Sequence, residues 1–173
     1  YPPITIFNAI TIKRFVIANI DIPDNSLSDI IWLNGATVKV DHLLVTDSRV
    51  GWDLNAAPAN PVFVYLVGVA VKDVIVKNCY VTATGTTRTG RVVSIFAPIT
   101  SATRIQIVDT YHDGYTLCFA PNTITTVPTV TFRGVKSAGL YLASSSDSYN
   151  MIIDGVELIA CAGGVAINNG ATS

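Results

Sequence analysis

The chain contains, near its middle, Val74-Ile75-Val76-Lys77-Asn78-Cys79-Tyr80-Val81, and a version of this stretch returns five more times. With Asn78 taken as the origin of the pattern, the equivalent positions are Asn19, Asp47, Asp109, Gly134 and Gly155. Successive origins are 28, 31, 31, 25 and 21 residues apart. Internal repeats of about 20 to 50 residues are typical of solenoids. We therefore predict a recurring strand whose connections vary in length.

The side chains around each origin follow a fixed apolar pattern. Four and two residues before it come Phe15/Ile17, Leu43/Val45, Val74/Val76, Ile105/Ile107, Val130/Phe132 and Met151/Ile153. One and three residues after it come Ile20/Ile22, Ser48/Val50, Cys79/Val81, Thr110/His112, Val135/Ser137 and Val156/Leu158. Strands alternate faces with period two. The inward-pointing residues therefore lie an even number of residues before the origin and an odd number after it, so the inward parity shifts by one residue at the origin. Asn, Asp and Gly take the left-handed conformation most readily, so each origin is predicted to be a one-residue corner between two short strands.

A further strand is predicted in each repeat, after its longest connection. Its copies are residues 30–35, 62–68, 92–98, 116–121, 139–143 and 164–170, and residues 4–9 have the same form. Gly, Pro or Ser ends these runs, as is usual for strands. Three strands per repeat and about six repeats account for nearly the whole chain. We therefore predict one all-β domain over residues 1–173, a parallel β-helix.

Composition narrows the possible partners. Half of the 173 residues are hydrophobic and only 13% are charged, against about 25% in an ordinary soluble domain, so part of the surface is predicted to face something other than water. A net charge of −1 gives no basic field for nucleic acid or a membrane surface. The apolar runs are too short to span a bilayer.

The three cysteines lack metal-type spacing, and neither a metal nor a cofactor is expected. Because no helix caps either end, we expect a piece of a longer chain.

Two outward columns carry polar side chains that should pair between repeats. Two residues after each origin stand Asp21, Arg49, Tyr80, Tyr111, Lys136 and Glu157. Five residues before it stand Arg14, His42, Asp73, Arg104, Thr129 and Asn150. Since neighbouring strands are ~4.8 Å apart, opposite charges and aromatic rings within each column are predicted to contact one another.

A third outward column is mostly apolar. Three residues before the origins stand Val16, Leu44, Ile75, Gln106, Thr131 and Ile152. An exposed apolar stripe indicates a partner surface. A homotrimer about a threefold axis would bury it, and the alternative is a loop of the same chain that covers this face.

The form Val74-x-Val76-x-Asn78-Cys79-x-Val81, with its polar corner and variable loops, resembles the right-handed β-helices of pectate-lyase-like proteins and of bacteriophage tailspikes and tail fibres. The resemblance covers residues 4 to 170 and implies a right-handed helix of about six coils. It also implies a homotrimeric virion appendage, outside the host cell and joined to other virion proteins, that recognises bacterial surface polysaccharide. The calcium-binding Asp residues and the basic residue of pectate lyases do not map onto this chain. We therefore expect a structural and glycan-binding domain, with a polysaccharide depolymerase, either a glycosidase or a lyase, as the alternative.

If the chain is an enzyme, its predicted site is the corner with the widest loops. Asp53 and Asp113 are the candidate catalytic carboxylates. Two strand spacings would hold them ~9.6 Å apart, near the upper end of the ~6.5–9.5 Å that inverting glycosidases use. The predicted substrate-binding side chains are Arg49, Trp52, Tyr80, Arg88, Tyr111 and Tyr115, because aromatic faces and Arg suit a sugar groove. The simpler interpretation, which we favour, is that both Asp residues are ordinary loop residues. Asp47 and Asp109 are interpreted as ladder residues, and His112 as a hydrogen-bonded core histidine. His42 beside Asp73 could form a base with its orienting carboxylate.

Overall fold

The computed structural model describes residues 3–25, 29–53, 62–84, 91–96, 104–112, 117–119, 129–137, 140–144, 150–158 and 165–169. All regular elements in these residues are β-strands, and they contain no helix. Nor do they contain any helix with the length and apolar character that a membrane crossing requires.

The strands form four parallel sheets. Sheet 1 holds β1 (Ile4–Ile6), β4 (Ile31–Asn34), β7 (Val62–Val67) and β10 (Arg91–Phe96). Sheet 2 holds β2 (Ile10–Ala18), β5 (Val38–Thr46), β8 (Ala70–Lys77), β11 (Arg104–Val108), β14 (Thr129–Arg133) and β17 (Asn150–Asp154). Sheet 3 holds β3 (Asp21–Asn25), β6 (Arg49–Asp53), β9 (Tyr80–Thr84), β12 (Tyr111–His112), β15 (Lys136–Ser137) and β18 (Glu157–Leu158). Sheet 4 holds β13 (Leu117–Phe119), β16 (Leu140–Ser144) and β19 (Val165–Asn169).

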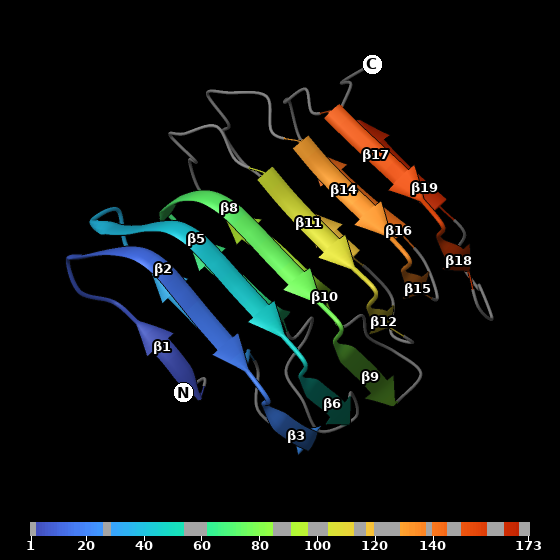
Figure 1. Ribbon diagram of the computed structural model, residues 1–173, viewed down its shortest axis with the longest axis horizontal. Helices are drawn as coiled ribbons and strands as arrows, with labels where there is room; N and C mark the ends of the chain where they lie inside the picture. The colour runs from blue at the N-terminus through green and yellow to red at the C-terminus, as the bar shows by residue number, and fades with distance from the viewer. Residues whose placement is uncertain are drawn as a thin grey trace.

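Every strand pairs with the strand three places away in the chain. All of these pairings are parallel, as predicted. Figure 1 shows the six strands of sheet 2 side by side, each leading at its end into a strand of sheet 3. The repeat is therefore one strand of sheet 2, one of sheet 3 and one of sheet 1 or sheet 4, in agreement with the three strands per repeat predicted from the sequence.

The corners between sheets 2 and 3 have the predicted backbone. Asn19, Asp47, Asn78 and Asp109 have φ angles of 58°, 51°, 51° and 47°. Gly134 and Gly155 take the same conformation at 59° and 60°. Backbone hydrogen bonds join each of the first five corners to the next repeat, for example from Asn78 N to the Val108 carbonyl at 3.0 Å. The prediction that all six origins are left-handed corners is confirmed.

The apolar core lies between the sheets and follows the predicted parity. Val76 and Ile107, on opposite sides of a strand pairing, are 0% and 3% exposed. Ile153 is an exception because it is 48% exposed. It lies on β17, which ends the strand order of sheet 2 and pairs within that sheet only with β14. Position at the end of the sheet, rather than a change of parity, explains this exposure.

A second change of parity occurs inside β2, β5 and β8 and was not predicted. In β5, Val38 and Val40 are buried, the next two residues point outward, and Leu43 and Val45 are buried again. These three strands curve visibly near their starts in Figure 1. We name this region the charged bend, which comprises Lys13, Arg14, Asp41, His42, Lys72 and Asp73 with the adjacent Lys39 and Arg104.

The outward apolar column of sheet 2 is in register from strand to strand. Val16 and Ile152, at its two ends, are 45% and 48% exposed. Leu44, Ile75 and Gln106 are half-buried by their neighbours, and Thr131 is buried. The column is therefore continuous but most open at its ends.

Candidate functional site

Each of the two corner carboxylates lies over the corner of the next repeat. Asp47 accepts hydrogen bonds from the Asn78 side-chain amide and from the Thr46 hydroxyl. These two bonds, the first above all, lower the pKa of Asp47 below its ordinary value. Asp109 lies over the next corner, because a Cβ added to Gly134 would come 2.5 Å from Asp109 Oδ1. Both Asp residues therefore fit the ladder interpretation given to them from the sequence.

The residue after three of the corners contacts the turn from inside. Ser48 and Thr110 donate their hydroxyl protons to the carbonyl oxygens two residues earlier, at 2.8 and 2.9 Å. Cys79 occupies the equivalent position, with its Sγ 3.3 Å from the Lys77 carbonyl oxygen. Burial raises the pKa of the Cys79 thiol to about 11. This cysteine is a core residue, as predicted.

His112 is also a core residue. Its side chain is buried, and Nδ1 lies 3.3 Å from the Val81 carbonyl oxygen. The prediction of a hydrogen-bonded core histidine is confirmed, and His112 takes no part in a surface site.

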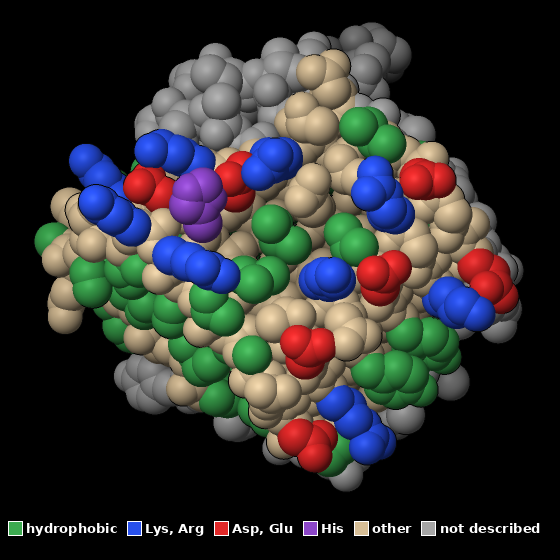
Figure 2. All heavy atoms as spheres, viewed as in Figure 1, with side chains coloured by type: hydrophobic (Ala, Val, Ile, Leu, Met, Phe, Trp, Pro, Cys, Tyr) green, Lys and Arg blue, Asp and Glu red, His purple; other side chains and the backbone are tan. Residues whose placement is uncertain are grey.

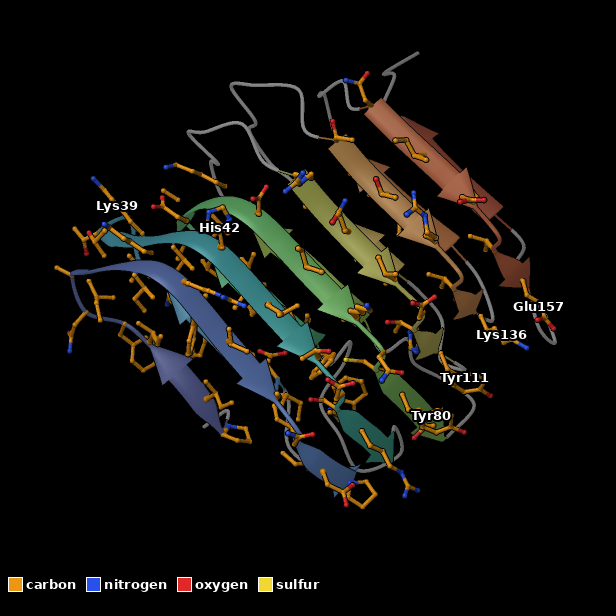
Figure 3. All side chains as sticks on the ribbon, in the orientation of Figure 1. Lys39, His42, Tyr80, Tyr111, Lys136 and Glu157 are labelled. Carbon is orange, nitrogen blue, oxygen red and sulfur yellow. The ribbon has the colours of Figure 1, made fainter. Side chains whose placement is uncertain are left out.

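The outward column of sheet 3, which we name the tyrosine ladder, consists of Asp21, Arg49, Tyr80, Tyr111, Lys136 and Glu157. The rings of Tyr80 and Tyr111 stack with centroids 4.5 Å apart and planes 8° apart. Lys136 forms an ion pair with Glu157 at 2.8 Å, which raises the pKa of Lys136. Figure 3 shows both pairs on the outer face of the sheet. These two contacts were predicted, whereas no ion pair joins Asp21 to Arg49 within the described residues.

The structure brings together three of the residues predicted to bind substrate. Arg49, Tyr80 and Tyr111 are consecutive partners in sheet 3. Tyr80 is 45% exposed, so part of the residue faces solvent. Since Tyr80 and Tyr111 each cover one face of the other, the pair offers edges and hydroxyl groups more than a flat platform for a sugar.

Trp52 does not join them, because its side chain is 1% exposed and packs in the core. The strand β6 continues through Trp52, and the inward parity of Val50 therefore carries the indole inward as well. Its role as an exposed sugar-stacking residue is not supported by this placement. The parity rule already applied to Ser48 and Val50 would have identified it.

Asp53 ends β6, where its backbone pairs with Thr84. The side chain of Asp53 lies outside the described part of the structure, as do Arg88, Asp113 and Tyr115. The predicted distance between the two candidate catalytic carboxylates therefore stays a prediction.

An open groove runs along the corners beside the tyrosine ladder. We name it the corner groove, and it is lined by Asn19, Ile20, Asp21, Asp47, Ser48, Arg49 and Asn78. Its side chains supply two amides, two carboxylates and a guanidinium group. The carboxylate of Asp47 is held in place by the hydrogen bonds from Asn78 and Thr46. The groove therefore presents fixed hydrogen-bond donors and acceptors at a surface bordered by Tyr80 in the next repeat.

The charged bend forms a second polar surface. Asp73 accepts from His42 Nδ1 at 2.8 Å, and it binds Arg104 through Nε at 3.1 Å and through a terminal nitrogen at 3.2 Å. Lys72 pairs with Asp41 at 2.8 Å and lowers the pKa of Asp41. The first of these ladders was predicted, and the second was missed because the parity change at the bend was not recognised.

The His42–Asp73 contact matches the sequence expectation of a histidine oriented by a carboxylate. Within the described residues, His42 bonds to Asp73 through the same 2.8 Å contact, and a hydrogen-bonded nucleophile is not among its partners.

The described residues contain no group of three or more His, Cys, Asp or Glu side chains placed to hold a metal ion. Comparison of the chain with protein-family models, curated proteins and solved structures finds no match in any of the three. The corner groove and the charged bend are therefore the features of the molecule from which we infer a function.

Proposed function

We propose that the strands stack as a right-handed parallel β-helix of about six coils, and that this helix is the shaft of a bacteriophage tailspike or tail fibre. In this proposal the domain binds a polysaccharide on the host surface and does not cleave it. The parallel pairing of every strand with the strand three places away supports the stacking. The observation that carries the binding function is the corner groove, with Arg49 and two side-chain amides next to an exposed tyrosine.

The chemistry of the corner groove suits sugar hydroxyl groups. Asn19 and Asn78 can each donate and accept, Asp21 accepts, and Arg49 donates through a planar group of nitrogens. The exposed part of Tyr80 adds apolar contact and a hydroxyl group. Charged, polar and aromatic groups follow one another from repeat to repeat along the tyrosine ladder, so an extended glycan could meet several of them at once.

The binding experiment uses a panel of capsular and lipopolysaccharide glycans and measures affinity by isothermal titration calorimetry. We expect Arg49→Ala to weaken binding of the recognised glycan about tenfold, as loss of one charge-assisted hydrogen bond predicts. Arg133→Ala is the matched control, because Arg133 is also exposed but belongs to sheet 2. It should change affinity less than about twofold. Absence of binding to every glycan, or equal loss in the two variants, would contradict the proposal.

The same incubations distinguish a binding domain from the depolymerase alternative. Reducing ends report hydrolysis, and absorbance of unsaturated products reports elimination. Our proposal predicts that neither signal appears. Cleavage that depends on Asp53 and Asp113 would replace the binding function by an enzymatic one.

We further propose that the domain is a homotrimer joined to other virion proteins. The apolar column on sheet 2 supports this, because Val16, Leu44, Ile75 and Ile152 lie in register on one outer face. Analytical ultracentrifugation should give a trimer at micromolar protein concentration. If only the monomer were observed, the proposed trimer would be wrong. The proposal that the corner groove binds a glycan would not be affected.

A further inference from the structure

The charged bend concentrates positive charge in a chain whose net charge is −1. It holds five of the eleven Lys and Arg residues and only two of the twelve Asp and Glu residues. Its formal charge is therefore +3 with His42 neutral, and the rest of the sequence carries the balance of −4. Figure 2 shows the Lys and Arg side chains gathered around the histidine on the face of sheet 2. The bend is thus a cationic surface on an otherwise acidic molecule.

The ion pairs within the bend leave part of this charge available. Asp73 is already bound by His42 and Arg104, and Asp41 is bound by Lys72. Within the described residues, no ion pair or hydrogen bond joins Lys13, Arg14 or Lys39 to a partner side chain. All three are exposed. They therefore can bind an external anion without breaking a contact of the fold.

A shallow groove adjoins these cations. It is lined by Ala9, Ile10, Thr11, Ala36, Thr37 and Lys39, at the starts of β2 and β5. Small side chains and two threonine hydroxyls leave room for an extended chain to lie against the backbone. Lys39 borders the groove and lies near His42 on the same outer surface, as Figure 3 shows. The cations and the groove together form one elongated surface and not a closed pocket.

We propose that this groove and the charged bend bind an extended polysaccharide that carries carboxylate or phosphate groups. An open surface gives a single small anion few contacts, whereas a polymer engages several weak charge contacts at once. Cations two strands apart on one ladder, such as Lys13 and Lys72, are ~9.6 Å apart along the stack. The inference rests on the proposed glycan-binding function and adds the charge class of the glycan. It also adds a second contact surface, because the bend precedes the corner by six strand residues, or about 20 Å.

The test measures binding of the full chain by biolayer interferometry to four immobilised polymers. Polygalacturonate carries carboxylates, inorganic polyphosphate carries phosphates, dextran is neutral, and double-stranded DNA is the competing polyanion. The variant Lys13→Gln/Arg14→Gln removes two unpaired cations from the bend. The control, Lys77→Gln/Arg133→Gln, also removes one Lys and one Arg from exposed positions of sheet 2, and Arg133 differs from the bend cations in its ion pair with Asp154 at 3.3 Å. Circular dichroism and thermal unfolding verify that both variants keep the fold.

We expect the wild-type chain to bind polygalacturonate or polyphosphate in preference to dextran and DNA. The bend variant should lose about tenfold in affinity for that polymer, as two lost charge contacts predict, and the control should lose less than about twofold. Whichever of the two polymers binds identifies the anionic group. Equal loss in both variants, equal or tighter binding of DNA, or binding of neither anionic polymer would overturn the inference. If Arg49-dependent binding of a neutral glycan persists in those cases, the proposed function survives and only this inference fails.

Discussion

The chain turns in two different ways along β2, β5 and β8: at the charged bend inside each strand and at the corner that follows it. At the corner, one residue with positive φ shifts the inward parity, and its neighbours are tied by hydrogen bonds between repeats. At the charged bend, two consecutive residues point outward, and none of the bend residues has a positive φ. The corner therefore restricts which amino acids can occupy it. The bend requires two consecutive outward-pointing residues but does not restrict which amino acids they are. Their side chains can therefore be chosen for function.

The largest expected effect is at the corner, at Gly134. In Gly134→Ala the new Cβ would meet Asp109 Oδ1 at 2.5 Å while φ stays at 59°. Left-handed strain, with a small added cost for displacing the exposed carboxylate of Asp109, should lower the free energy of unfolding by about 2 kcal/mol. Gly155→Ala is the control, because its Cβ finds nothing closer than 3.7 Å and it should cost about 1 kcal/mol. Chemical denaturation measures both, and equal losses would show that the Asp109 contact is unimportant.

The next effect concerns the buried thiol beside the corner. The pKa of Cys79 is raised from 9.0 to about 11 in the folded chain. Its contribution to stability is therefore complete below pH 9 and is lost as the pH rises from 9 through 11. By pH 10 the wild type should have lost about 1.4 kcal/mol relative to Cys79→Ser.

At pH 7 the serine variant should be nearly as stable as the wild type, because Ser48 and Thr110 already fill the equivalent positions. Urea unfolding at pH 7, 8, 9 and 10 makes the comparison. Parallel pH profiles for the two proteins would contradict the assigned burial.

A smaller loss is expected from Asp47→Ala. The variant keeps a Cβ at a φ of 51° and removes the acceptor for Asn78 and Thr46. We expect a loss of about 1 kcal/mol in the free energy of unfolding. Asp47→Asn keeps an acceptor and tolerates the same φ, so its loss should be about half as large. A greater loss for Asn than for Ala would argue against this role.

The smallest effect on stability is expected at the bend. Asp41→Asn removes the partner of Lys72 in an exposed ion pair and should change the free energy of unfolding by less than about 0.5 kcal/mol. The same change raises the net positive charge of the bend and should strengthen binding of the anionic polymer. Thermal unfolding and biolayer interferometry test both parts. A loss of stability as large as that of Gly134→Ala would abolish the distinction between corner and bend.

Much of the fold could be predicted because the same pattern of corner and apolar residues occurs in all six repeats. Asn, Asp and Gly at the six origins give the corners, and the apolar residues on either side of them give the walls. The rule also covers Trp52, whose parity matches Val50, and the misassignment came from treating that residue as part of a loop. The exposure of Ile153 does not follow from parity, because it depends on the place of β17 at the end of its sheet.

The site was harder to predict than the fold. Stacking of Tyr80 on Tyr111 follows directly from strand register. The cationic surface does not, because it requires a second parity change that places Lys13, Asp41 and Lys72 outward beside the predicted His42 ladder. Apolar spacing alone gives a weak signal there. The pairs Lys13–Arg14, Asp41–His42 and Lys72–Asp73, each between buried or half-buried apolar residues, were the signal in the sequence.

The central claim is that repeats far apart in sequence are stacked in register, one strand spacing per repeat. Double electron–electron resonance tests it most directly, with spin labels at Asp21→Cys and Glu157→Cys after Cys79, Cys118 and Cys161 are changed to Ser. The two sites lie on β3 and β18, five strand steps apart in sheet 3. The account predicts one narrow distribution centred near a backbone separation of ~24 Å. A broad distribution, or a single one centred far beyond that distance, would contradict it.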